Sequence, residues 1–122
     1  MVDDDPYSHM ICRKMIQRTI GELEFIEFTF PAKAVEYIES AYNTGECATI
    51  LLLDINMPVM SGWEFLEWFE TVDQHVKDQF TIYLLSSSVD PRDKEKAMAN
   101  KNVKGFFMKP FKKVMVEEIF AL

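Results

Sequence analysis

The sequence has few of the features that mark secreted, membrane or repetitive proteins. It contains two cysteines in 122 residues and no repeats or low-complexity stretches. No apolar run approaches the roughly 20 residues of a membrane helix, and the start Met1-Val2-Asp3-Asp4-Asp5 lacks a basic and apolar leader. Because Cys12 and Cys47 show no metal-ligand spacing, we interpret them as free thiols that fill the core, and we expect a cytoplasmic protein.

Positive charge is also scarce, since the formal net charge is −7. This balance argues against direct nucleic-acid binding, which depends on Lys and Arg that neutralise phosphates. The charge is uneven, because residues 92–122 carry eight Lys and Arg against four acids. The apolar fraction of 48% is typical of a globular protein, and the length suits a single domain over residues 1–122.

Helix and strand signals alternate along the chain. Asp5-Pro6 and Asp90-Pro91 have the pattern of a cap followed by proline, and Ser61 with Glu64 has the spacing of a capping box. The predicted helices cover about 6–20, 31–43, 61–76, 91–100 and 111–122. Strands are predicted at 23–29, 50–53, 81–85 and 103–108, after a short first strand at 1–2. This order predicts an α/β fold with a parallel sheet between two layers of helices.

Polar residues follow four of the predicted strands. They are Asp3-Asp4-Asp5, Asp54, Ser86-Ser87-Ser88 and Lys109-Pro110. In an open parallel sheet the carboxyl ends of the strands meet at one edge, where ligands bind. Converging carboxylates repel each other, and Mg²⁺ with its preference for oxygen ligands and phosphate relieves that repulsion. One carboxylate could then attack phosphorus while a lysine and a hydroxyl hold the phosphoryl oxygens.

Each of these clusters has an ordinary structural explanation when taken alone. Three aspartates in a row are most often a solvated turn, and Asp54 could simply cap nearby amides. Lys-Pro marks the end of an element, and a serine cluster often leads into a helix. The conjunction of all four clusters, each at a strand end and in order, favours a functional site.

The chain resembles the receiver domains of two-component response regulators over essentially its whole length. The motifs are Val2-Asp3-Asp4-Asp5-Pro6, Leu52-Leu53-Asp54-Ile55-Asn56-Met57-Pro58 with Ser61-Gly62, Leu84-Leu85-Ser86-Ser87-Ser88, and Gly105-Phe106-Phe107-Met108-Lys109-Pro110-Phe111. The resemblance implies a flavodoxin-like, doubly wound sheet of five parallel strands in the order 2-1-3-4-5, arranged in three layers.

The resemblance also implies the ligands of the metal. Asp54 would be the phosphoacceptor and a ligand of Mg²⁺. Asp4 would bind the ion directly, Asp3 would bind it through water, and Asn56 would bind it through its backbone carbonyl.

Four further positions match the part of the family site that senses the phosphoryl group. Ser86 corresponds to the hydroxyl that moves toward the phosphoryl group, and Lys109 to the lysine that pairs with it. The peptide bond to Pro110 is typically cis in the family. Phe106 matches the aromatic switch position, although this chain has Phe where Tyr is common.

The implied function is a signalling switch. A histidine kinase or a histidine phosphotransfer protein would donate the phosphoryl group to Asp54, and the chain would catalyse only its own phosphorylation and dephosphorylation. The face formed by the fourth helix, fifth strand and fifth helix would contact an unknown downstream protein or output domain. Because this face carries Lys94, Lys96 and Lys112, we expect an acidic partner.

Two departures from the family concern the ends of the chain. Only Met1 and Val2 precede the acidic pair, and the last helix ends at Leu122, so both terminal elements are expected to be short. His9 and His75 are remote from the predicted site strands, and we assign them no role.

Three other functions were weighed. A receiver without phosphotransfer would act by contact alone, but Asp3, Asp4, Asp54, Ser86 and Lys109 are all present. A flavin carrier would need hydroxyls and glycine amides for the flavin phosphate where this chain has carboxylates. A metal-dependent phosphatase would carry a second acid two residues after the nucleophile, where this chain has Asn56.

Overall fold

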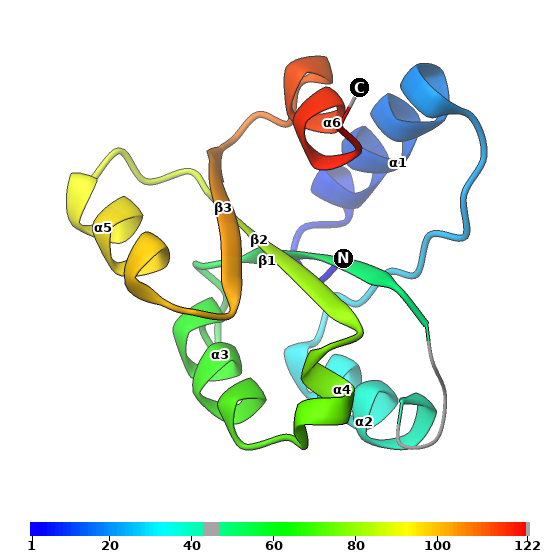
Figure 1. The fold of residues 1–122 in the computed structure, drawn as a ribbon. Helices are drawn as coiled ribbons and strands as arrows, with labels where there is room; N and C mark the ends of the chain where they lie inside the picture. Colours follow the sequence, from blue (N-terminus) through cyan, green and yellow to red (C-terminus); the bar gives the residue numbers. More distant parts are fainter. Residues whose placement is uncertain (43–46, 122) are drawn as a thin grey trace.

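The computed structural model describes residues 1–42 and 47–121 (Figure 1). The helices are α1 (Pro6–Ile20), α2 (Pro31–Ala41), α3 (Gly62–Glu70), α4 (Gln74–Lys77), α5 (Pro91–Ala99) and α6 (Lys113–Ile119). The strands are β1 (Thr49–Asp54), β2 (Phe80–Ser86) and β3 (Val103–Met108). These strands confirm the three runs predicted at 50–53, 81–85 and 103–108, and the α/β class is confirmed.

The three strands form a parallel sheet with β2 in the middle. Asp54 at the end of β1 is in register with Leu85, and Ser86 at the end of β2 is in register with Met108. Lys109 follows Met108 directly, and its amide donates a hydrogen bond of 2.8 Å to the Ser86 carbonyl. The parallel register therefore brings Asp54, Ser86 and Lys109 to one edge of the sheet.

The other two predicted strands are reduced to single bridges. Val2 pairs in parallel with Phe28 on one side and with Leu53 on the other. Its amide donates to the Leu52 carbonyl at 2.8 Å, and its carbonyl accepts from the Asp54 amide at 2.9 Å. The prediction of a regular strand over 23–29 was wrong, because a strand needs a neighbour with a run of facing amides and carbonyls. The three described strands therefore do not establish a five-stranded order.

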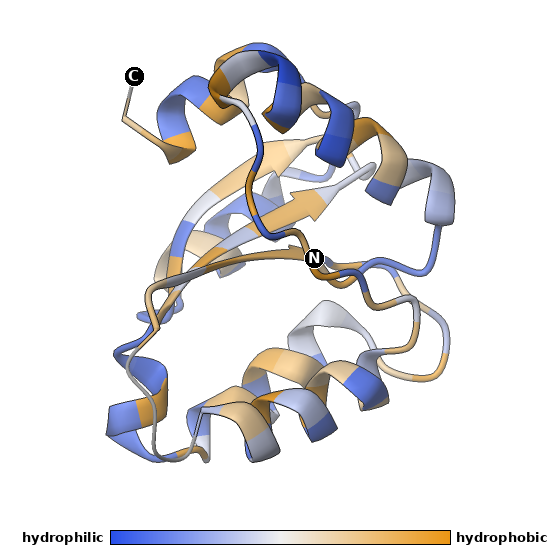
Figure 2. Ribbon diagram, turned by 90° about the vertical axis from the view of Figure 1, so that its right-hand side faces the viewer, coloured by the Kyte–Doolittle hydropathy of each residue, from blue (hydrophilic) through white to orange (hydrophobic). Residues whose placement is uncertain are grey.

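Apolar side chains on the two faces of the sheet pack against different helices. Leu53, Ile82 and Leu84 belong to one buried cluster, which includes residues of α2 and α3. Leu52 and Leu85 point to the other face and pack with residues of α1 and α6. This alternation along each strand gives the three layers seen in Figures 1 and 2, with apolar residues toward the sheet and hydrophilic residues outward.

Local sequence signals place most of the helix starts correctly. The Asp5 carboxylate accepts from the Tyr7 amide, and the Asp90 carboxylate accepts from the Arg92 amide, each at 3.0 Å. The Ser61 hydroxyl accepts from the Glu64 amide and the Glu64 carboxylate accepts from the Ser61 amide, both at 3.2 Å. The capping box predicted from the spacing of these two residues is confirmed.

Helix ends were predicted less well. The third helix ends at Glu70, so Val76 lies on the separate short helix α4 and does not extend the stripe of α3. The last helix begins at Lys113 and ends at Ile119, which is shorter than the predicted 111–122, and Leu122 lies outside the described residues. The predicted end of the second helix at Asn43-Thr44-Gly45 also lies outside them.

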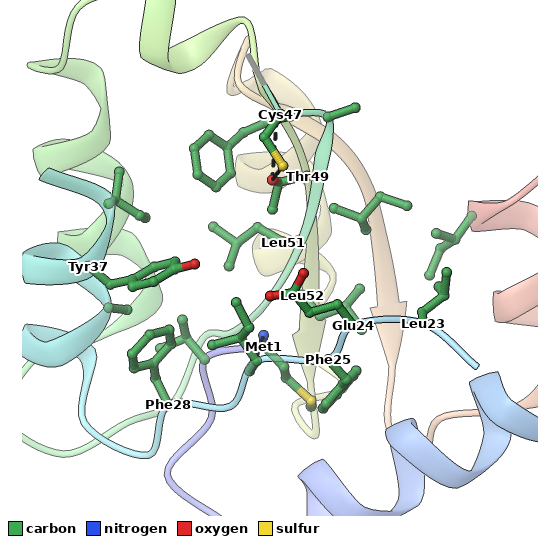
Figure 3. A pocket seen from close by; sticks show the side chains of 18 of the residues that line it. Met1, Leu23, Glu24, Phe25, Phe28, Tyr37, Cys47, Thr49, Leu51 and Leu52 are labelled. Atoms are coloured by element: carbon green, nitrogen blue, oxygen red, sulfur yellow. Dashed lines mark hydrogen bonds between the residues drawn. The ribbon is translucent and has the colours of Figure 1, made fainter. Parts of the chain in front are cut away.

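A cavity of about 410 Å³ lies between residues 23–28 and β1 (Figure 3). Tyr37 and Leu51 reach into it, with Met1 at one side (Figure 3). Val2 bridges Phe28 and Leu53 next to this space. Val2 lines the cavity and lies between the two extended segments that border it. We therefore interpret the cavity as a gap in the sheet and not as a binding pocket for a small molecule.

The structure bears on the expectations that the cysteines are free core residues and that the chain has no membrane helix. Both cysteines are free, as predicted, and Cys12 is buried, but Cys47 is exposed and does not fill the core. Within residues 1–42 and 47–121, no helix combines the length and the apolar character needed to cross a bilayer.

Gly62 is the residue whose replacement most directly tests how α3 sits against β1. A Cβ atom at this position would lie 2.6 Å from the Asp54 carbonyl oxygen and 2.8 Å from the Ile55 Cα atom, both in the backbone. We predict that Gly62→Ala lowers the free energy of unfolding by about 1 to 3 kcal/mol, the usual cost of overpacking, in urea denaturation. Gly105→Ala is the comparison, because its Cβ would meet the Tyr83 ring at 3.0 Å and no backbone atom, so we expect a smaller loss. Equal stability of Gly62→Ala and the wild type would contradict this packing.

Candidate functional site

Three carboxylates meet at the carboxyl edge of the sheet. Oxygens of Asp3, Asp4 and Asp54 all lie within 4.8 Å of one another. Asp3 and Asp54 are buried, with exposed fractions of 0% and 3%, while Asp4 is exposed. The predicted convergence of these residues is confirmed, and its cause is the pair of bridges that hold Val2 beside the end of β1.

Asp3 is held at every polar atom. Its amide donates to the Phe28 carbonyl at 3.0 Å, and its carbonyl accepts from His9 Nε2 at 2.8 Å. Its Oδ1 atom accepts from the Asp5 amide at 2.9 Å, and its Oδ2 atom accepts from Lys109 Nζ at 2.7 Å. Asp3 therefore has a fixed position although it follows a bridge and not a regular strand.

Lys109 brings positive charge to the cluster from the end of β3. Its Nζ atom lies 2.7 Å from Asp3 Oδ2, 3.4 Å from Asp54 Oδ1 and 3.4 Å from Ser8 Oγ. The peptide bond to Pro110 is cis, as expected. The lysine predicted from the Lys-Pro pair therefore contacts both buried carboxylates, and Ser8 is a contact that the sequence did not predict.

Ser86 is the last residue of β2 and is fully buried. Its hydroxyl oxygen accepts from the Ser88 amide at 2.9 Å, which leaves the hydroxyl proton available for a different acceptor. Asn56 is exposed and lies two residues after Asp54. Phe106 is half buried on β3 and packs against the core cluster that contains Leu84.

Burial and charge act on the acidity of the cluster. The pKa of Asp54 is raised from 3.8 to about 6 because burial and, to a smaller extent, the neighbouring Asp3 charge outweigh the opposing effect of Lys109. Burial also lowers the pKa of Lys109, but the hydrogen bond to Asp3 and the charges of Asp3 and Asp54 outweigh it, so the net change is upward. At Asp54, burial and the Asp3 charge together therefore outweigh the effect of the one ammonium.

The residues of this cluster fit a magnesium ion. Asp3, Asp4 and Asp54 offer oxygen donors, which hard divalent cations prefer, and the exposed Asp4 leaves one side open to water. A divalent cation would also favour the ionised form of Asp54, whose pKa burial has raised. Asn56, assigned to the metal through its backbone carbonyl, stays a prediction.

The expectation that His9 is remote from the site was wrong. It lies on α1 with an exposed fraction of 1%, and its Nε2 atom contacts the Asp3 carbonyl. One sequence signal could have found it, since His9 has the helical spacing of the buried residues Cys12 and Ile16. The contact with Asp3 depends on how the loop between Asp3 and α1 folds back, and no local pattern reveals that.

The sequence and the fold of this chain are similar to those of known proteins. A family model described as a response regulator receiver domain matches residues 1–120. A two-component response regulator of Cytophaga hutchinsonii is 31% identical, with a TM-score of 0.89 over 98% of this chain and 90% of that chain. A receiver protein of Dyadobacter fermentans is 24% identical, with a TM-score of 0.84 over 98% and 91%.

More distant likenesses show the fold alone. The chemotaxis protein CheY4 of Vibrio cholerae is 22% identical, with a TM-score of 0.72 over 98% of this chain and 92% of that chain. No match was found among curated proteins. The α/β fold is therefore of the flavodoxin-like receiver type, with a parallel sheet.

The raised pKa of Asp54 predicts a pH effect on stability without metal. Folding favours the protonated carboxyl, so the stabilising effect of that proton is complete below pH 3.8 and is lost as the pH rises through about 6. The free energy of unfolding of the wild type should therefore fall relative to that of Asp54→Asn between pH 4 and 7, by roughly 2 to 3 kcal/mol.

Urea denaturation at several pH values in the presence of EDTA measures this difference. If the difference in unfolding free energy between wild type and Asp54→Asn stayed constant from pH 4 to pH 8, the surroundings of Asp54 would not destabilise its ionised carboxylate. Saturating Mg²⁺ at pH 7 should recover part of the lost stability, because it binds the folded protein.

Proposed function

The chain belongs to the family of response regulator receiver domains of two-component signalling, and we propose that Asp54 accepts a phosphoryl group with Mg²⁺ bound beside it. The observation that supports this most strongly is that Asp54 lies close to the other two carboxylates and also contacts Lys109. An isolated buried carboxylate would have no means to approach a phosphoryl group that carries the same charge. Here a candidate cation site and an ammonium both lie close to the carboxylate.

The reaction is a transfer between two nucleophiles. An oxygen of Asp54 forms a bond to phosphorus, the P–N bond of a donor phosphohistidine breaks, and the imidazole keeps the electron pair of that bond. Bound Mg²⁺ would supply positive charge to the carboxylates and to the phosphoryl oxygens. The side chains that the fold holds at this edge would position the phosphoryl group, and positioning is most of what phosphoryl transfer requires.

Asp3, Asp4 and Asp54 would hold the metal, with Asn56 as a further ligand. Lys109 would exchange part of its contact with Asp54, now 3.4 Å, for a phosphoryl oxygen. The Ser86 hydroxyl has its oxygen engaged by the Ser88 amide, so its proton can be donated to the phosphoryl group. Phe106, half buried beside this edge, would repack when Ser86 moves.

Phosphorylation would alter the face formed by α5, β3 and α6, and this face would bind a downstream protein or output domain. The phosphoryl donor would be a histidine kinase or a histidine phosphotransfer protein, and the chain would act as an acceptor that catalyses only its own modification. The strand order 2-1-3-4-5 belongs to the same proposal, and the bridges of Val2 with Phe28 and Leu53 support it.

Three alternative functions fit this chain less well. A receiver that acts by contact alone has no use for three carboxylates held together at an energetic cost, with Asp54 raised to a pKa of about 6. A flavin phosphate would meet Asp3, Asp4 and Asp54 at this edge and be repelled by them. The absence of an acid at Asn56 argues against a phosphatase with an aspartate nucleophile.

Phosphorylation of Asp54 can be tested directly. We predict that the protein gains one phosphate when it is incubated with acetyl phosphate and Mg²⁺, measured by intact mass, and that EDTA abolishes the gain. Asp54→Asn should show no adduct because it lacks the nucleophile, and Asp73→Asn, on the exposed start of α4, should react normally. An adduct that survives Asp54→Asn would refute the assignment of the phosphoacceptor.

Charge on the output face gives a second test. Lys94, Lys96 and Lys112 are exposed, and we propose that the downstream partner presents an acidic surface to them. Reversing all three to Glu should weaken binding of the partner protein by tenfold or more and should reduce its dependence on salt. Lys33→Glu on α2 is the control, because Lys33 is exposed on a different helix. Unchanged affinity of the triple variant would show that this charge plays no part in binding.

A further inference from the structure

His9 combines complete burial with an incomplete set of hydrogen bonds. Its exposed fraction is 1%, and its Nε2 atom lies 2.8 Å from the Asp3 carbonyl oxygen. Its Nδ1 atom is the one buried side-chain nitrogen or oxygen without a partner among residues 1–42 and 47–121. A polar atom that is removed from water without a partner costs free energy.

An apolar side chain would avoid this cost. His9 lies on the face of α1 that also buries Cys12 and Ile16, where a leucine or methionine would pack without an unpaired nitrogen. The imidazole must therefore contribute something that an apolar group cannot. The contact with Asp3 supplies it, since a carbonyl oxygen only accepts and the ring must donate through Nε2–H.

The bond to His9 acts on the peptide that joins the two metal-binding acids. The Asp3 carbonyl belongs to the peptide unit that continues into Asp4, and this unit is planar. Fixing the carbonyl oxygen therefore fixes the direction in which the chain enters Asp4. Asp4 is exposed and no hydrogen bond to its carboxylate is present within the described residues, so its position depends on this backbone.

The other bonds of Asp3 come from different directions. Phe28 holds the amide from the neighbouring extended segment, and the Asp5 amide and Lys109 hold the two carboxylate oxygens. Among these bonds, only the His9 bond comes from a helix, α1, which packs on one face of the sheet. It ties the acidic loop to the interior of the molecule.

We propose that His9 is a positioning residue for the metal site, whose Nε2–H bond to the Asp3 carbonyl keeps the carboxylates of Asp3 and Asp4 in the geometry that binds Mg²⁺. This inference rests on the proposed function, because it concerns the same site. His9 contacts neither the metal nor the phosphoryl group and acts through the backbone of Asp3. Groups that orient metal ligands in this way typically contribute a factor of 10 to 100 to metal affinity.

The test compares Mg²⁺ affinity among variants of the full chain. His9→Met fills a similar volume without a donor and should raise the Mg²⁺ dissociation constant about tenfold or more, measured by isothermal titration calorimetry at a temperature where it is folded. His9→Gln keeps an N–H donor and should stay closer to the wild type than His9→Met does. Cys12→Ala, one turn along the same buried face, removes packing without a bond to Asp3 and should leave the dissociation constant unchanged.

Stability in EDTA separates positioning from a structural role. A purely structural His9 would lower the free energy of unfolding and leave the Mg²⁺ affinity of the folded protein unchanged, and that result would overturn the proposal. Equal loss of affinity in His9→Gln and His9→Met would also overturn it, because the donor would then be irrelevant.

The wild type gives an independent check if the variants do not fold. Nitrogen-15 NMR of the His9 ring should show the hydrogen on Nε2, and a ring with its hydrogen only on Nδ1 would overturn the proposal. The proposed function fails separately, since it requires the wild type to bind Mg²⁺ and to be phosphorylated. Wild-type binding that equals the binding of His9→Met refutes the role of His9 alone.

Discussion

Electrostatic repulsion among three carboxylates at one edge of a parallel sheet is the constraint on which this site depends. Asp3 and Asp54 are buried and Asp4 is exposed, and the Lys109 ammonium offsets only part of their charge. Burial, followed by the charge of Asp3, raises the pKa of Asp54 to about 6, so Asp54 holds a proton more tightly than a free aspartate does. The fit to a divalent cation and the expected pH dependence of stability thus both arise from carboxylates gathered at a buried edge.

The backbone around the cluster explains how such an unfavourable arrangement is maintained. Val2 lies between Phe28 and Leu53 and carries Asp3 to the edge, while Gly62 allows α3 to approach the Asp54 carbonyl more closely than a Cβ atom permits. Asp3 is then held at its amide, its carbonyl and both carboxylate oxygens. The stability of the core therefore supports a local geometry that repulsion would otherwise open.

The sequence predicted the parts of the molecule that local physics determines. The run at Ile50–Leu53 was found because a strand covered on both faces is continuously apolar, and the Ser61 capping box was found because its partners are three residues apart. The strand predicted at 23–29 failed because a strand depends on its neighbour, and only Val2 pairs there. Val76 has the right spacing for α3, but the chain leaves the helix after Glu70. The contact of His9 with Asp3 is tertiary and leaves no local pattern.

The two buried aspartates are chemically alike in the sequence, yet their contacts give them different abilities. Both oxygens of Asp3 accept hydrogen bonds, and Lys109 lies at 2.7 Å from it. Asp54 has a longer contact of 3.4 Å at one oxygen, and its other oxygen accepts no hydrogen bond from the described residues. Each Asp3 oxygen shares its electron density with a hydrogen-bond donor, which lowers its nucleophilicity, whereas one Asp54 oxygen accepts no hydrogen bond from the described residues. Of the two buried carboxylates, Asp54 is therefore the more nucleophilic, because its negative charge is less compensated by hydrogen bonds than the charge of Asp3.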